Sequence, residues 1–333
     1  MDTVGDLARS LVLGTHHTRL NRELDQLGVE IATGFVRDPA RHLQGDVTGL
    51  VALDRDLSRL EAFRISTTEA AARAATMQTT LEEIQGRVEL LSQVLLSAEL
   101  TPTQEMRETF AEEAQNAMGQ VLGGLNRNIG GRFLFSGTAN DTPAVAGLDT
   151  MLADLRSALA GQTTADDIDT ALDAWFDTVG GSFETSGYLG ATEDASPIRL
   201  GTGESVALDV RGDDAVFRAV LKSVAKAALA TDDTLALAPE VQTELLSQAG
   251  RELLGHQQGL VEMRAGLGAK EARIEEVTAR NAAQRTALSM MRVELVGTDS
   301  FEAAARYENV RAQLESLYAI TARSSQLSLV DFL

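Results

Sequence analysis

The sequence contains no cysteine and few aromatic residues. The absence of cysteine from its 333 residues excludes disulfide bonds and thiolate metal sites. Aromatic residues make up 4% of the chain and include one tryptophan, Trp175, which argues against a large aromatic-lined ligand pocket. The hydrophobic fraction of 44% comes mainly from leucine, alanine, valine and methionine, which is typical of the seams between packed helices.

Basic residues are scarce relative to acidic ones. The chain has 29 lysines and arginines against 49 aspartates and glutamates, a formal charge of -20. Nucleic-acid binding requires clustered basic side chains that displace counterions from phosphates, so we expect no nucleic-acid partner. The segment 140–214 has 15 acidic and 3 basic residues, and we expect it to form a solvated, outward-facing head.

Long apolar runs are also missing. Nowhere do 18 apolar residues follow one another, and the start of the chain has no basic region followed by an apolar segment. The sequence therefore predicts no membrane insertion and no cleaved Sec signal. Any secretion would have to use a route that needs no such signal.

Signatures of catalysis and cofactor binding are incomplete. The stretch Gly201–Val206 lacks the third glycine and the following helix of a dinucleotide-binding fingerprint, and Ser136 lacks the preceding glycine of a nucleophile elbow. The four histidines form no His-Glu-x-x-His pattern, and the aspartates of 166–173 lack the glycine and glutamate of a calcium loop. We predict no enzymatic activity, no cofactor and no metal.

Helical periodicity is the strongest positive signal. Apolar residues spaced by 3 and 4 define three seams, one near each end and one long seam before the last. The first seam contains Leu13, His17, Leu20, Leu24, Leu27 and Ile31; the long seam runs from Leu260 to Leu295; the last contains Ala303, Tyr307, Val310, Leu314, Leu317 and Thr321. The tail then ends in the apolar residues Leu327, Leu329, Phe332 and Leu333, which are rarely left in water.

Turn and capping signals divide these helical stretches. We expect a break at Gly34, a loop at 37–39, a helix from about 47–53 to Leu95, and a next helix capped by Thr101 or Thr103 and ended by Gly130 and Gly131. Further predictions are short helices over 148–159 and 166–179, a hairpin of 197–200 with 205–210, and a helix over 215–230 capped by Asp213.

These signals predict a mainly α fold. We expect a long antiparallel helical coiled-coil stalk, formed by the N- and C-terminal parts of the chain, with a small α+β insertion domain at one end. The predicted parts are terminal helices (1–36 with 298–333), a stalk (37–139 with 213–297) and a head (140–212).

Two motifs carry a resemblance to a known family. The stretch Gly130–Thr138, Gly-Gly-Arg-Phe-Leu-Phe-Ser-Gly-Thr, follows a long helical hairpin, and 318–333 forms an apolar C-terminal end. Both resemble the bacterial flagellin superfamily, most of all its third hook-associated protein, the hook-filament junction subunit. The loop Val36–Pro39 departs from the serine and paired aspartates common in that family.

The resemblance implies a structural role. It implies a subunit exported unfolded through the flagellar secretion channel with a chaperone, which then joins copies of itself, the preceding hook-associated protein and flagellin in the extracellular flagellum. The stalk-to-head junction would contain Gly130, Gly131, Arg132, Phe133, Phe135 and Gly137. The assembly interface would contain Leu13, Leu20, Leu24, Leu27, Ile31, Leu314, Leu317, Leu327, Leu329, Phe332 and Leu333.

Three other interpretations remain open at this point. Filament flagellin has the same terminal seams, and so would a soluble coiled-coil adaptor or an export cargo of another system. An ordinary intramolecular bundle would also bury these stripes. Terminal helices that depend on neighbouring copies distinguish the flagellar interpretations from the bundle, because isolated helices take most of their stability from packing.

Overall fold

The computed structural model describes residues 2–97 and 102–330. Its elements are α1 (Asp2–Thr33), α2 (Pro39–His42), α3 (Thr48–Leu96), α4 (Gln104–Leu125), β1 (Asn128–Ile129), β2 (Arg132–Phe133), α5 (Leu148–Leu159), α6 (Ala165–Asp177), the π-helix η2 (Phe183–Gly187), β3 (Ile198–Gly201), β4 (Glu204–Val206), α7 (Ala215–Ala228), α8 (Pro239–Val296) and α9 (Ser300–Val330). The mainly α fold with a small α+β insertion is confirmed.

Contacts divide the chain into two compact units. Unit 1 comprises residues 1–62 and 281–333, and unit 2 comprises residues 63–280. The boundary falls within α3 and α8, each of which contributes to both units. The finer division into terminal helices, stalk and head stays a prediction.

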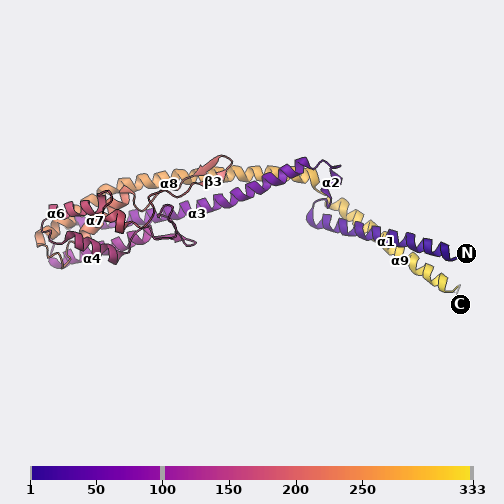
Figure 1. Ribbon diagram of the computed structural model, residues 1–333, viewed down its shortest axis with the longest axis horizontal. Coiled ribbons are helices and arrows are strands. Elements are labelled where there is room, and N and C mark those ends of the chain that lie inside the picture. The colour runs from indigo at the N-terminus through magenta and orange to yellow at the C-terminus, as the bar shows by residue number, and fades with distance from the viewer. Residues whose placement is uncertain (1, 98–101, 331–333) are drawn as a thin grey trace. The chain divides into compact units, whose positions relative to one another are not determined.

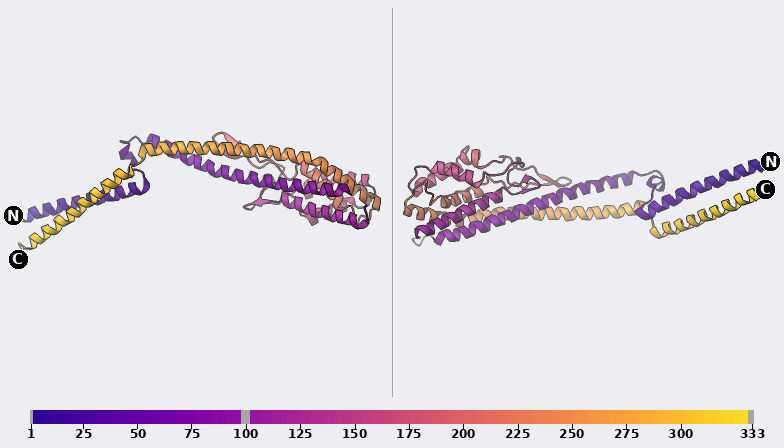
Figure 2. Two further views of the ribbon diagram at one scale, coloured as in Figure 1. Left: turned by 180° about the vertical axis from the view of Figure 1, so that it is seen from behind. Right: turned by 90° about the horizontal axis from the view of Figure 1, so that it is seen from below.

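Unit 1 is built on two pairs of antiparallel helices. α1 and α9 lie side by side (Figures 1 and 2). The first part of α3 and the last part of α8 are joined by ion pairs from Arg292 to Asp54 (3.0 Å) and from Arg285 to Glu61 (3.3 Å). The arginine with the lower number on α8 pairs with the acidic residue with the higher number on α3, so the two segments run antiparallel.

Gly34 ends α1, as predicted, and begins a short connection. Its φ of +73° is a left-handed conformation that glycine adopts without strain. Backbone hydrogen bonds from Val36 N to Val296 O and from Thr298 N to Gly34 O, both 2.9 Å, tie the segment after α1 to the segment before α9. The two terminal helices are therefore anchored at the same point of unit 1.

The loop expected at residues 37–39 leads into a short helix, α2, that we did not predict and that begins at Pro39. Asp38 Oδ1 accepts a hydrogen bond from Arg41 N at 3.0 Å, and Pro39 occupies the first helical position of α2. Proline is favoured there because its missing N–H would have no partner within the helix. The departure from the family loop pattern therefore still leaves one working cap.

The core of unit 2 lies between α3, α4, α7 and α8. Thr103 caps α4 by accepting a hydrogen bond from Met106 N at 3.3 Å. It is one of the two residues that we predicted for this role. The α3 and α8 segments of this unit are antiparallel too, with Arg264 contacting Gln85 at 2.7 Å. Nine of the 14 residues of α7 are buried, and this helix packs against α4 and α6.

The insertion follows its local sequence signals closely. α5 has the predicted bounds 148–159, and α6 begins after Thr164, one of two cap candidates with Asp166. The Thr164 hydroxyl accepts a hydrogen bond from Asp167 N. The rings of Trp175, Phe176 and Phe183 pack together with centroid distances of 4.5–5.9 Å. These three rings form a small aromatic core within the insertion.

The β3–β4 hairpin is predicted correctly and lies against α8. Glu204 forms ion pairs with Arg273 at 3.0 Å and with Arg280 at 2.5 Å, and Lys270 pairs with Asp209. These contacts connect the acidic insertion to the basic side chains of α8. They explain why Lys270, which interrupts the apolar seam of α8, is charged.

Gly130 and Gly131 do not end a helix, and that prediction is wrong. α4 ends at Leu125, and the two glycines form the turn of a β1–β2 hairpin with φ values of +58° and +81°. A two-residue hairpin loop with both φ values positive favours glycine, which explains the pair. The sequence signal for a turn was therefore correct, but its context was not.

The helix over 215–230 is shorter than predicted and has a different cap. Asp214 rather than Asp213 occupies the N-cap of α7, and its carboxylate accepts a hydrogen bond from Arg211 N at 3.0 Å. Burial raises the pKa of Asp214. Arg211 also binds Asp213 and Asp194, so the two adjacent aspartates are committed to one arginine.

Candidate assembly surface

The predicted apolar seams of the two terminal helices face each other in unit 1. Leu20 and Leu27 of α1 and Val310 of α9 are buried, and Leu24, Tyr307, Leu314 and Leu317 pack around them while partly exposed. Leu13 is half-buried. Burial of one leucine side chain contributes about 1.5–3 kcal/mol, and the only buried members of the two seams are Leu20, Leu27, Ala303 and Val310 among the described residues, so the pair has a thin core.

Ile31 leaves the seam, and Glu30 takes its place. Ile31 is 36% exposed, whereas Glu30 is 7% exposed. The carboxylate of Glu30 is satisfied because it accepts hydrogen bonds from Gln26 Nε2 at 2.8 Å and from Arg37 N at 3.2 Å. The loop after α1 therefore draws a glutamate inward, and the heptad pattern gave no sign of this.

His17 has a partner on the opposite helix. Its Nε2 is hydrogen-bonded to Tyr318 Oη at 2.7 Å, and the two rings meet edge to face with centroids 5.3 Å apart. This polar contact is part of the α1–α9 seam and shows no sign of a ligand site. It fixes the register of the two helices where the apolar contacts thin out.

The predicted interface at the tail is only partly described. Leu327 and Leu329 belong to α9, but their side chains lie outside the described residues, as do Phe332 and Leu333 altogether. The structure therefore places Leu20, Leu24, Leu27, Leu314 and Leu317 in the seam and Ile31 on the surface.

Exposed apolar side chains gather in unit 1. Among the described residues, 11 large hydrophobic side chains of this unit are exposed, compared with 7 hydrophobic residues that are buried. The exposed set is Leu11, Val12, Val29, Ile31, Val51, Met290, Met291, Val293, Phe301, Tyr318 and Ile320. Such an excess marks an interaction surface. Most of these positions fall off the heptad seams, which is why sequence analysis missed them.

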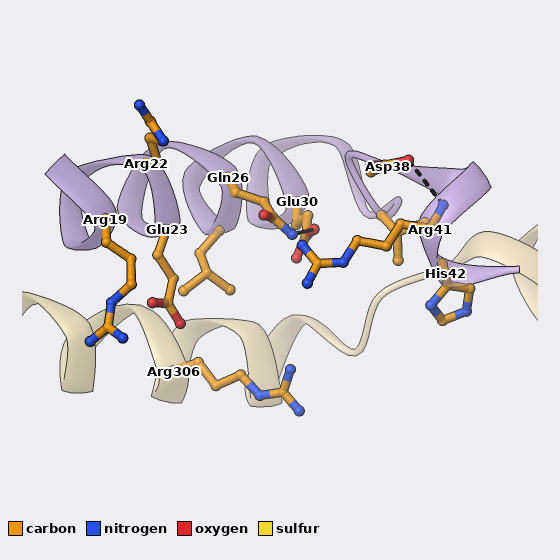
Figure 3. Close-up of a pocket in the computed structure, with 11 residues that line it drawn as sticks. Arg19, Arg22, Glu23, Gln26, Glu30, Asp38, Arg41, His42 and Arg306 are labelled. Atoms are coloured by element: carbon orange, nitrogen blue, oxygen red, sulfur yellow. Dashed lines mark hydrogen bonds between the residues drawn. The ribbon is translucent and has the colours of Figure 1, made fainter. Parts of the chain in front are cut away.

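A polar groove opens beside the seam, bounded by α1, α2 and α9. It has a volume of about 750 Å³ and is lined by Arg19, Arg22, Glu23, Gln26, Leu27, Glu30, Val36, Asp38, Arg41, His42 and Arg306. In Figure 3, Arg19 and Glu23 point from α1 toward α9, and the Arg41 side chain extends toward Glu30. All these residues belong to unit 1.

The segment predicted as the stalk-to-head junction forms several backbone hydrogen bonds with other segments of unit 2. Phe135 O accepts from Gly212 N at 2.8 Å, Ser136 O accepts from Ala191 N at 2.9 Å, and Thr138 N donates to Glu193 O at 3.1 Å. Phe135 is fully buried against Phe217, whereas Arg132 is exposed and Phe133 half-buried.

A buried polar cluster in unit 2 could be mistaken for a catalytic site. Ser223 Oγ lies 2.8 Å from Glu252 Oε2 and 3.2 Å from His256 Nε2, and Lys226 binds both Glu252 and Asp169. Ser223 is completely buried, so its hydroxyl cannot reach a substrate. Burial lowers the pKa of His256. The cluster serves to satisfy Lys226, which is 3% exposed.

The described part of the chain has neither a metal-binding cluster nor a membrane-spanning helix. No three or more histidine or acidic side chains there are arranged so that they could hold a metal ion. None of the described helices combines the length and the apolar character that crossing a bilayer requires.

Comparison with known proteins identifies the C-terminal part of the chain. Residues 256–333 match the model of the bacterial flagellin C-terminal helical region. The matched segment contains most of α8 and all of α9, and therefore the C-terminal half of the seam. This part of the chain is therefore similar to the C-terminal helices of bacterial flagellins.

Solved structures from two bacteria share the fold of this chain. FlgL of Bacillus cereus superposes with a TM-score of 0.52 at 15% identity, covering 73% of this chain and 99% of its own. A putative flagellar hook-associated protein of Vibrio parahaemolyticus superposes with a TM-score of 0.50 at 12% identity, covering 78% of this chain and 98% of its own. No curated protein matches the chain.

Proposed function

We propose that this chain is the structural subunit that joins the hook to the filament of a bacterial flagellum. It polymerises through its terminal helices with copies of itself, with the preceding hook-associated protein on one side and flagellin on the other. The flagellin match and the shared fold with two proteins named as FlgL and as a putative hook-associated protein support this proposal.

One observation carries the assembly part of the proposal. Unit 1 exposes 11 large hydrophobic side chains and buries 7 hydrophobic residues, counted over its described side chains. A monomer that exposed this surface would gain free energy by covering it, at about 25 cal/mol for each Å² of apolar area. Neighbouring copies in a tube provide that cover. The seam leucines and the tail residues Leu327, Leu329, Phe332 and Leu333 belong to the same proposed interface.

The terminal helices are proposed to order on assembly. Helices depend on tertiary packing for most of their stability, and the α1–α9 pair has four buried hydrophobic residues among its described side chains. In the free subunit residues 1–36 and 298–333 would therefore be weakly helical, which suits export in an unfolded state with a chaperone. The stalk (37–139 with 213–297) and the head (140–212) would fold beforehand.

Labelling of isolated flagella tests the proposed location. An antibody or fluorescent tag on the head is expected to give a single band at the tip of the hook. Signal along the whole filament would instead show that the chain is a filament flagellin, a second candidate that the flagellin match favours. No flagellar signal would leave the coiled-coil adaptor or export cargo.

Substitutions in the terminal helices test the proposed interface. Leu20→Asp places a charge in the seam, and Leu329→Asp places one in the tail; each is expected to abolish incorporation while unit 2 stays folded. The far-UV circular dichroism of the free subunit should change little when the first 35 and last 33 residues are deleted. Loss of helix in full proportion to the residues removed would contradict assembly-dependent ordering.

A further inference from the structure

The groove beside the α1–α9 seam contains arginines without carboxylate partners. Arg19, Arg22 and Arg41 line it, and none forms an ion pair within the described part of the chain. Most other arginines of this acidic protein are paired. In unit 1, for example, Arg285 and Arg292 bind carboxylates on α3, and Arg306 at the groove rim binds Glu302.

The carboxylates inside the groove are largely committed elsewhere. Glu30 accepts hydrogen bonds from Gln26 and from Arg37 N, and Asp38 caps α2 by accepting one from Arg41 N. Glu23 is exposed and has no ion-pair partner among the residues described. Glu30 and Asp38 keep their negative charge when they accept these bonds from neutral donors, so the lining has four arginines against three carboxylates and a formal charge of 4 - 3 = +1.

The chain itself contains enough acidic residues to provide carboxylate partners for these arginines. Unit 1 has 12 basic and 16 acidic residues, whereas unit 2 has 17 basic and 33 acidic ones. Arginine is also the side chain that suits this role, because its planar guanidinium binds a carboxylate through two parallel hydrogen bonds and stays charged at any physiological pH. An open groove of about 750 Å³ has room for several such side chains.

We propose that this arginine groove receives an acidic segment of a second copy of the chain during assembly. The inference rests on the proposed function. It adds to that function a specific electrostatic contact, in contrast to the apolar contacts of the α1–α9 seam. Exposed ion pairs are screened by salt, so the groove would make self-association depend on ionic strength. Self-association through the apolar contacts alone would not weaken in this way as the salt concentration rises.

The composition of the chain allows a direct test by zero-length cross-linking. Its only lysines are Lys222, Lys226 and Lys270, all in unit 2, so Arg41→Lys places a single side-chain amine in the groove. A carbodiimide would join that amine to a contacting carboxylate. In an assembly of mixed ¹⁴N and ¹⁵N subunits, mass spectrometry separates links between copies from links within one copy.

The matched control is Arg55→Lys, because Arg55 is exposed on α3, lies outside the groove and has no ion pair in the described structure. We expect links between copies to be roughly fivefold more frequent at position 41 than at position 55, as an ion pair of ordinary strength would give. Links only to Glu30 or Asp38 of the same copy, or equal yields at both positions, would overturn the proposal.

Charge reversal separates the groove from the proposed function as a whole. The double variant Arg19→Glu/Arg41→Glu is expected to self-associate about five- to tenfold more weakly than the wild type at about 50 mM salt, and to approach it at about 500 mM. Arg55→Glu should behave as the wild type. If the groove variant associates normally, the groove proposal fails alone. If the wild type never self-associates, both proposals fail.

Discussion

The two units of the chain differ in whether their apolar residues are buried or exposed. Unit 2 buries a continuous core that reaches from Ala70 and Leu95 of α3 through α4 and α7 to Val277 of α8. Unit 1 has a small core in its terminal pair and exposes more large hydrophobic side chains than it buries. Charge follows the same division, because most of the excess acidity belongs to unit 2.

This difference shows how one chain can combine a stably folded unit with a unit whose apolar surface is left uncovered. A domain with a complete core folds alone, and its high net charge keeps it soluble. A unit with apolar surface and nearly balanced charge gains further stability from contacts with other molecules. We therefore expect substitutions in unit 2 to change the stability of the free subunit and substitutions in unit 1 to change assembly.

The largest expected effect comes from Gly137→Ala in unit 2. A Cβ there would lie 2.3 Å from Glu193 O and 2.7 Å from Ala191 O, at a φ of +63°. Two backbone oxygens cannot move aside cheaply, so we expect a loss of about 4 kcal/mol or more. Chemical denaturation of the free subunit measures it. Gly161→Ala is the control, because it has a similar φ of +82° with open space around it and should cost only about 1 kcal/mol.

Truncation of a buried side chain in each unit sharpens the comparison. Phe135→Ala should destabilise the free subunit by about 3–5 kcal/mol, since the ring is fully buried against Phe217. Leu20→Ala removes a side chain that is 4% exposed, yet it should leave the main unfolding transition unchanged and weaken assembly instead. Equal shifts in that transition would show that unit 1 folds with unit 2.

A smaller effect is expected from pH in unit 2. His256 faces Ser223, Glu252, Lys222 and Lys226, and burial lowers its pKa below the usual 6.5 while Glu252 opposes this. Its unfolded form therefore binds protons more readily, so stability is full above about pH 6.5 and falls as the pH drops toward the folded pKa. His256→Gln should flatten denaturation midpoints measured between about pH 7.5 and 5.5, whereas the exposed His42→Gln should not.

The smallest predicted effect is that of Tyr318→Phe. It removes the hydrogen bond to His17 Nε2 and keeps the ring contact. At a half-exposed site the loss is about 0.5–1 kcal/mol, and it should appear in the critical concentration for assembly and not in the unfolding of the free subunit. A change in that unfolding would place the α1–α9 pair in the folded part of the free protein.

Local signals were sufficient for much of the fold. α5, the cap of α6 and the β3–β4 hairpin follow from periodicity and turn residues close in sequence. The heptad registers of α1 and α9 also place Leu20, Leu27 and Val310 on facing sides. Such features depend on residues within one or two turns of each other, which is the range that pattern analysis covers.

Features set by distant contacts could not be predicted in the same way. Glu30 is buried because Arg37 N reaches back to it, and the role of Gly130 and Gly131 depends on the strands that they connect. The exposed apolar side chains and the arginine groove require knowledge of which faces remain uncovered. The assembly surface was thus predicted in its seam and missed in its outer faces.

Amide hydrogen exchange of the free and the assembled subunit tests the central claim most directly. We predict that α1 and α9 exchange rapidly in the free subunit and become protected on assembly, while α4 and α7 are protected in both states. Equal protection of α1 and α9 in the free subunit would contradict the account, because the terminal pair would then be complete without a neighbouring copy.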